Sequence, residues 1–315
     1  MAKKLKNITV IGAGIMGHAL AIVFAKGGLE VFLTDIDRGK LDQARILIKS
    51  YLEFSFSQGL VAESPEAILE RIKTENTWES FAPKTDFIIE AIIEDVEAKR
   101  ELFQRLARDI GPETIVASNT SYLDVFPLAP DSIQERLLIT HFFSPPYLIP
   151  LVEIIGGPRT KPAAIDEVAL LMKDMGMTPV TLKKFLPGFI VNRIQRAIGR
   201  EALYLIDEGF AEPAEIDRAI KASMAIRLPV LGIFGRYDFA GLDMAVRALK
   251  APSLGLASED RLSPQLLKLV TDGHLGVKSG KGFYNYENRS PAEVFKERDA
   301  KLIKIIKILR ELWEI

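Results

Sequence analysis

The chain has 315 residues, of which 48% are hydrophobic, and a formal net charge of −1. This length suits about two domains. The balanced charge excludes a protein whose main partner is nucleic acid or an anionic membrane surface, and the lack of cysteine excludes disulfides, thiolate metal sites and a cysteine nucleophile. Because no apolar run approaches the ~18 residues of a membrane span, we expect a soluble, cytoplasmic protein that acts on a small molecule without a metal.

The first 35 residues predict a strand, a glycine-rich turn, a helix and a second strand. The strand at residues 7–11 leads into Gly12-Ala13-Gly14-Ile15-Met16-Gly17, the helix runs to about residue 26, and the next strand at 30–34 ends at Asp35. The turn matches G-x-G-x-x-G in the structural context that binds a dinucleotide.

Each part of this loop has a physical task. Gly12 permits the tight turn, Gly14 lets the backbone approach a pyrophosphate, and Gly17 lets the helix and strand pack closely. The start of the helix supplies free N–H groups and a partial positive charge for the phosphates. The expected loop contacts to the cofactor are Gly12, Gly14, Ile15, Met16 and Gly17.

Asp35 lies 18 residues beyond Gly17, close to the ~20 typical of the acidic residue that accepts hydrogen bonds from the adenosine ribose. Its carboxylate would repel a 2′-phosphate, and Ile36 rather than an arginine follows it. We therefore expect NAD as the cofactor, although Arg38 keeps NADP open as an alternative.

Helical and strand patterns then alternate. Helices are predicted at 38–58, 65–72, 96–110 and 161–175, and strands at 87–89, 115–118, 137–141, 151–155 and 179–181. This order predicts an α/β domain with a doubly wound parallel sheet over residues 1–185. Strand signals end there, and residues 186–315 predict an all-helical domain that begins with a long helix at 189–206.

The last predicted helix begins at a capping box, in which Ser290 and Glu293 flank a proline at the first helical position. An apolar stripe follows from Leu302 to Trp313 at helical spacing. This helix either packs on its own domain or forms a subunit contact.

The strands at 137–141 and 151–155 each carry one ionisable residue, His141 and Glu153. A carboxylate among aliphatic side chains is costly unless it has a partner. The connection between the strands is short enough to bring the chain back alongside itself, so we expect the two side chains to meet. A histidine oriented by a carboxylate is a general base suited to neutral pH. With the dinucleotide loop, this pair predicts an oxidoreductase.

From the glycine loop to Gly282-Phe283-Tyr284-Asn285-Tyr286, the chain resembles the 3-hydroxyacyl-CoA dehydrogenase family. The resemblance rests on Ser118-Asn119-Thr120-Ser121, His141-Phe142-Phe143, Leu151-Val152-Glu153 and Pro187-Gly188-Phe189-Ile190-Val191-Asn192-Arg193. It implies a Rossmann-like NAD-binding domain followed by a helical substrate and dimerisation domain, and hence a homodimer.

The resemblance also implies roles for the site residues. His141 would take the proton from the substrate 3-hydroxyl as hydride leaves carbon 3 for the nicotinamide, and Glu153 would fix the imidazole tautomer. Ser121 and Asn192 would hydrogen-bond the substrate oxygens. Two alternatives are that Ser121 caps a helix and that Asn192 is structural.

Further cofactor contacts follow from the resemblance. Glu94 and Lys99 match positions near the nicotinamide half of the cofactor, Lys278 matches another contact, and Ser144 stands where the family usually has asparagine. For Glu94, Lys99 and Lys278, a solvated surface role is the alternative.

The expected substrate is a short-chain L-3-hydroxyacyl-CoA such as 3-hydroxybutyryl-CoA. However, residues 50–58 lack the basic side chains that a CoA phosphate favours, although aromatics there, such as Tyr51, could stack on adenine. In carrying Arg227 at this place the chain resembles the branch that acts on free 3-hydroxy acids, the gulonate and carnitine dehydrogenases. This resemblance implies that Arg227 binds a substrate carboxylate; the alternative is a helix-end salt bridge. A non-catalytic dinucleotide-binding protein is the third alternative.

Overall fold

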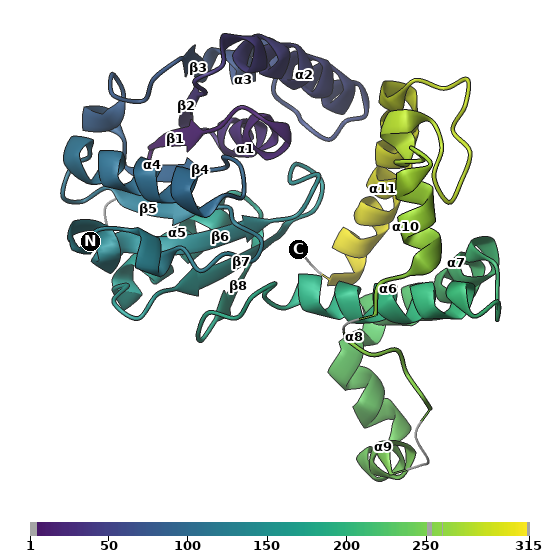
Figure 1. The fold of residues 1–315 in the computed structure, drawn as a ribbon. Coiled ribbons are helices and arrows are strands. Elements are labelled where there is room, and N and C mark those ends of the chain that lie inside the picture. The colour runs from purple at the N-terminus through teal and green to yellow at the C-terminus, as the bar shows by residue number, and fades with distance from the viewer. Residues whose placement is uncertain (1–4, 251–253, 260, 314–315) are drawn as a thin grey trace. The chain divides into compact units, whose positions relative to one another are not determined.

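The computed structural model describes residues 5–250, 254–259 and 261–313. The chain divides into two compact units, Met1–Asn192 and Arg193–Ile315. The first unit contains the sheet and the second is helical (Figure 1). The boundary expected from the sequence, between residues 185 and 186, lies in the segment that leads into the first helix of the second unit.

The sheet of the first unit has eight strands in the order β3-β2-β1-β4-β5-β6-β7-β8. Their bounds are β1 Asn7–Ile11, β2 Glu30–Thr34, β3 Ile72–Glu75, β4 Phe87–Glu90, β5 Ile115–Ser118, β6 Leu137–Phe142, β7 Leu151–Gly156 and β8 Thr178–Leu182. Neighbouring strands run parallel except β6 and β7, which are antiparallel. The connection over residues 143–150 is too short for the crossover that a parallel pair needs.

Helices cover both faces of this sheet. They are α1 Ile15–Lys26, α2 Arg38–Ser57, α3 Pro65–Glu70, α4 Val96–Asp109 and α5 Pro162–Asp174, with short 3₁₀ turns η1 Ala82–Lys84, η2 Phe126–Leu128 and η3 Asp131–Arg136. One core cluster includes buried residues of α1, α2 and α5, and a second includes those of α4 and η2. The fold is therefore the predicted α/β layer structure, with a mostly parallel sheet.

The edge strand β3 corrects one prediction. The helix expected at 65–72 ends at Glu70, and Ile72–Glu75 pairs with β2 instead. This strand has four residues and alternates between half-buried and exposed positions. Such a short, polar segment carries little signal of its own, and the open edge of β2 decides its conformation.

The second unit consists of helices and one 3₁₀ turn, η4, in the part that the structure describes. They are α6 Val191–Asp207, α7 Pro213–Ala222, α8 Met224–Ala240, α9 Leu242–Leu249, α10 Pro264–Thr271, η4 Val277–Ser279 and α11 Pro291–Trp313. At α11, Ser290 and Glu293 form the predicted capping box; residues 314 and 315 of the expected segment lie outside the described residues. No described helix is both long enough and apolar enough to cross a membrane.

Phe189 corrects a second prediction. It was expected in the first turns of a long helix, but α6 begins at Val191, and Phe189 has a φ of 49°. Its side chain is fully buried in the core cluster that includes α4. Its conformation and burial set the path of the chain as it leaves the sheet.

Candidate active site

His141 and Glu153 face each other across the antiparallel pair of β6 and β7, in direct register. His141 Nδ1 lies 2.9 Å from Glu153 Oε2. The His141 residue is 4% exposed and Glu153 is 0% exposed. The contact expected from the sequence is therefore present, in a buried environment where a charged hydrogen bond is strong.

The second oxygen of Glu153 has its own partners. Oε1 accepts hydrogen bonds from the backbone N–H groups of Ile190, at 2.9 Å, and Val191, at 3.1 Å. These donors stabilise the charged carboxylate at the start of α6. As an ionised carboxylate, Glu153 can only accept, so Nδ1 of His141 must carry the proton that they share. In the neutral imidazole this tautomer leaves the lone pair of Nε2 free, which is the form that a general base requires.

Two aromatic rings flank the imidazole. The ring centroid of Phe143 lies 4.6 Å from that of His141, and that of Phe189 lies 5.1 Å away. They restrict the plane in which the imidazole can lie. Phe189 was expected in the first turn of the long helix, but the preceding Pro187 and Gly188 are the sequence signal that the helix had not yet begun, and Gly188 has a φ of 77°.

The glycine loop has the geometry of a dinucleotide site. Gly12 has a φ of 102°, and a Cβ atom on Gly17 would lie 1.6 Å from the carbonyl oxygen of Gly12. A Cβ on Gly14, by contrast, would meet nothing within 4 Å. Gly14 is also the N-cap of α1 and offers no side-chain cap. The N–H groups that begin α1 at Ile15 and Met16 are therefore approachable, which fits the phosphates of a dinucleotide.

Asp35 follows β2 beside this loop. Its Oδ2 accepts from the N–H of Ala13 at 2.8 Å, and its Oδ1 accepts from the N–H of Asp37 at 2.9 Å. Each carboxylate oxygen can accept more than one hydrogen bond. The arrangement orients Asp35 and leaves it able to accept from ribose hydroxyls.

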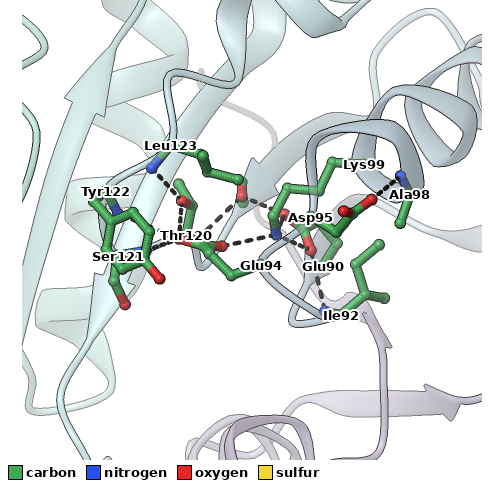
Figure 2. A network of polar contacts seen from close by, with 11 residues as sticks. Glu90, Ile92, Glu94, Asp95, Ala98, Lys99, Thr120, Ser121, Tyr122 and Leu123 are labelled. Atoms are coloured by element: carbon green, nitrogen blue, oxygen red, sulfur yellow. Dashed lines mark hydrogen bonds and ion pairs between the residues drawn. The ribbon is translucent and has the colours of Figure 1, made fainter. Parts of the chain in front are cut away.

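Glu94 and Lys99 belong to one polar network (Figure 2). Lys99 is 1% exposed, and its Nζ lies 2.7 Å and 2.9 Å from the two oxygens of Glu90 and 3.4 Å from Glu94 Oε2. The alternative of a solvated surface role is therefore wrong for Lys99. Its ammonium is already bound by carboxylates of the protein.

Glu94 holds the turn that follows β5. Its Oε1 accepts from the Thr120 hydroxyl at 2.6 Å and from the Ser121 N–H at 2.8 Å. Partial burial acts to raise the pKa of Glu94, but these hydrogen bonds, one from the Tyr122 N–H and the charge of Lys99 lower it below its usual value. Glu94 is therefore an anion at neutral pH.

Ser121 lies in a bend and caps no helix, because the next one, η2, begins at Phe126 with Val125 at its N-cap. The helix-cap alternative is therefore wrong for Ser121. Asn192 is half-buried in the first turn of α6, directly after the two residues that bind Glu153. Ser144 is exposed in the connection between β6 and β7.

Two predicted site residues belong to the second unit. Lys278 is exposed in η4, and Arg227 is exposed in α8, where its Nε lies 3.4 Å from the carbonyl oxygen of Ser223. No ion pair joins Arg227 to another residue in the described part of the chain. The structure therefore does not show the expected alternative of a helix-end salt bridge.

Tyr51 on α2 is buried against the connection after β6. Its ring centroid lies 3.7 Å from that of Tyr147, and 8% of the residue is exposed. Tyr51 is thus occupied within the protein, which corrects the expectation that it could stack on the adenine of CoA.

Comparison with known proteins identifies the family. The 3-hydroxyacyl-CoA dehydrogenase NAD-binding domain matches residues 7–185, and the C-terminal domain of the same family matches residues 188–286. The chain belongs to the 3-hydroxyacyl-CoA dehydrogenase family. It is an NAD-dependent dehydrogenase whose first domain binds NAD.

Relatives in this family differ in their substrates. A probable 3-hydroxybutyryl-CoA dehydrogenase of Deinococcus radiodurans is 37% identical over 88% of this chain and 99% of its own length. An L-carnitine dehydrogenase of Pseudomonas putida is 31% identical over 98% of this chain and 95% of its own. The crystal structure of an NAD⁺-dependent dismutase, 5-formyl-3-hydroxy-2-methylpyridine 4-carboxylic acid 5-dehydrogenase, superimposes with a TM-score of 0.88 at 28% identity, covering 97% of this chain and 99% of that one.

Proposed function

We propose that this protein oxidises the 3-hydroxyl of a short-chain L-3-hydroxyacyl-CoA, such as 3-hydroxybutyryl-CoA, to the 3-oxoacyl-CoA. The observation that carries the proposal is the buried contact between His141 and Glu153 in the same domain as the dinucleotide loop. The identity with the Deinococcus radiodurans protein supports the CoA ester as substrate. Membership of the family favours an enzyme over a non-catalytic dinucleotide-binding protein.

NAD, held by the glycine loop and Asp35, would supply the acceptor for the hydride that leaves carbon 3. His141 Nε2 takes the proton of the hydroxyl as the carbon–oxygen double bond forms, and later releases it to solvent. Glu153 stabilises the resulting imidazolium, because its carboxylate lies 2.9 Å from Nδ1. The Ser121 hydroxyl and the Asn192 amide hydrogen-bond the substrate oxygens and orient carbon 3.

A free 3-hydroxy acid is the second candidate substrate, and Arg227 favours it. Arg227 is exposed and forms no ion pair with the described residues, so it is available to bind a carboxylate through two parallel hydrogen bonds. The match to the carnitine dehydrogenase covers 98% of this chain. The match to the Deinococcus radiodurans protein covers 99% of that protein but only 88% of this chain.

The deciding experiment measures NADH formation with 3-hydroxybutyryl-CoA, L-carnitine and gulonate, for the wild type and for Arg227→Ala. We expect turnover of the CoA ester, with kcat/KM changed less than about threefold by Arg227→Ala, since a thioester has no carboxylate to bind. Turnover of a free acid alone, lost in Arg227→Ala, would reject the CoA ester and support the second candidate.

The assembly that accompanies this function is a homodimer formed through the helical domain. The apolar exposure of that domain supports it: Phe234 is 81% exposed and Phe239 is 82% exposed, both on α8. Large exposed apolar side chains that cluster on a folded protein mark sites of protein–protein contact.

A further inference from the structure

Glu90 is a buried carboxylate to which the reaction above assigns no task. It ends β4, is 0% exposed, and accepts from the Lys99 ammonium at 2.7 Å and 2.9 Å and from the Ile92 N–H at 3.1 Å. The Ser118 hydroxyl, at the end of β5, also donates to it. With these partners the carboxylate is fully satisfied, and the buried charge holds Lys99 in one place.

Lys99, held by Glu90, also binds the carboxylate of Glu94. Its ammonium lies between the two carboxylates, 3.4 Å from Glu94 Oε2, as Figure 2 shows. The lysine comes from the first turn of α4, which Asp95 caps by accepting from the Ala98 N–H at 2.9 Å. Since the ammonium is bound to a buried carboxylate on a strand, it is a fixed charge rather than a mobile one.

Glu94 in turn determines the shape of the turn after β5. Three donors of that turn meet its Oε1: the Thr120 hydroxyl, the Ser121 N–H and, at 3.3 Å, the Tyr122 N–H. Thr120 closes the turn by accepting from the Leu123 N–H at 2.9 Å. The position of Ser121 therefore depends on where the Glu94 carboxylate lies.

This turn lies at the edge of the sheet where the chemistry takes place. The carboxyl ends of β1, β4, β5 and β6 are neighbours, and they carry, in that order, the glycine loop, Glu90, the Ser121 turn and His141. Ligands of open α/β sheets bind outside these strand ends, where the strand order reverses. In addition, Asn119 Oδ1 accepts from the Phe142 N–H at 3.0 Å, which connects the turn to the residue after His141.

We propose that Glu90 and Lys99 are positioning residues: they hold the carboxylate of Glu94, which places Ser121 opposite His141 for the substrate. The proposal rests on the role given to Ser121 in the proposed function. Without the ammonium, Glu94 loses the ion pair on its Oε2 side, and its carboxylate lacks the fixed charge that orients it against the turn.

The test removes both buried charges together. The double variant Glu90→Gln, Lys99→Met removes the buried ion pair as a whole, a replacement that is often neutral for stability. Glu94 keeps its hydrogen-bond partners in the turn and loses the charge of Lys99. The matched control is Glu97→Gln, Arg100→Met, which makes the same charge changes in an exposed ion pair on the same helix.

Two measurements follow. The first is hydrogen exchange of the Ser121 and Tyr122 backbone amides, which needs no substrate. We expect the buried double variant to lose protection at these amides by about tenfold or more, and the control to retain it. Unchanged protection would overturn the proposal, whatever the substrate of the enzyme.

The second measurement is a double-mutant cycle in kcat with the substrate that the wild type oxidises. We expect the buried double variant to lower kcat by about ten- to a hundredfold, but to have little further effect in a Ser121→Ala background. If the decreases in kcat caused by the buried double variant and by Ser121→Ala multiply in the combined variant, the network does not act through Ser121. Loss of amide protection in a protein that oxidises none of the tested substrates would retain the network and reject the proposed function.

Discussion

At the scale of single residues, the site depends on carboxylates whose two oxygens have different tasks. Glu153 binds His141 through one oxygen and two backbone N–H groups through the other. Glu94 binds three donors of a turn through one oxygen and faces Lys99 through the other. A carboxylate bound on both sides has one orientation, and this is what orienting a catalytic group requires.

The role of His141 predicts a loss of turnover without a loss of cofactor binding. His141→Gln keeps a polar side chain of similar length but removes the base, so kcat should fall by about 10²- to 10⁴-fold. The Kd for NAD, measured by quenching of protein fluorescence, should stay within about twofold of the wild type. A variant with wild-type turnover would contradict the proposed mechanism.

The carboxylate of Asp35 is expected to determine the preference of the enzyme for NAD over NADP. Asp35→Asn retains an acceptor for the Ala13 N–H but removes the charge that repels a 2′-phosphate. The ratio of kcat/KM for NADP to that for NAD should rise by about tenfold. If the ratio is unchanged, Asp35 does not contact the ribose.

The lowered pKa of Glu94 predicts how its contribution to stability depends on pH. A carboxyl group whose pKa is lower in the folded than in the unfolded protein stabilises the fold above its usual pKa, and this contribution disappears as the pH falls through the folded value. Glu94→Gln should therefore lower the free energy of unfolding at pH ~7, and the difference from the wild type should shrink below pH ~4. Urea unfolding at several pH values measures it; a difference that does not depend on pH would contradict the assignment.

At the scale of elements, two glycines of the glycine loop differ in what surrounds them. A Cβ on Gly17 would overlap the Gly12 carbonyl, whereas a Cβ on Gly14 meets no atom of the protein. Close packing of strand and helix thus accounts for Gly17, whereas no atom of the protein accounts for Gly14, where we propose that the cofactor approaches.

This difference yields a matched pair of variants. Gly17→Ala should lower the melting temperature by several degrees, consistent with a loss of about 2–4 kcal/mol from overpacking. Gly14→Ala should leave the melting temperature nearly unchanged but weaken NAD binding by about tenfold or more in calorimetry. Equal NAD affinity in Gly14→Ala and the wild type would show that no phosphate lies against this residue.

At the scale of the whole molecule, the two units differ in how well they bury their apolar residues. Most buried hydrophobic side chains belong to the sheet domain, whereas the described residues of the helical unit supply Ile206, Ala257 and Ile303. Many large side chains on α6, α8 and α10 are exposed instead. This asymmetry is expected of a domain that completes its core with a second copy of the chain.

The proposed homodimer predicts a mass in solution of about 70 kDa, twice the 35.0 kDa of the chain. Phe234→Ser, Phe239→Ser removes two exposed aromatic side chains of α8 and should shift the sedimentation equilibrium toward the monomer. The control Ile46→Ser changes a residue that is 63% exposed on α2 and should leave the dimer intact. A wild type that sediments as a monomer would refute the assembly.

Much of the fold could be predicted from the sequence because it follows from local patterns. The glycine spacing, the alternation of helices and strands, and the helical character of the described residues after β8 are properties of short segments. The contact between His141 and Glu153 was also predictable, because a short connection between two apolar strands permits little else than an antiparallel return.

The tertiary structure alone decided three features: the strand β3, the burial of Phe189 and the burial of Lys99. In sequence, Lys99 follows the pattern of a solvated helix residue. Its burial is tolerated only because Glu90, from β4, and Glu94, from the loop after it, lie against its ammonium. The free energy of burying a charge or of pairing a strand edge depends on contacts between separate elements. The residue pattern within one element therefore does not predict it.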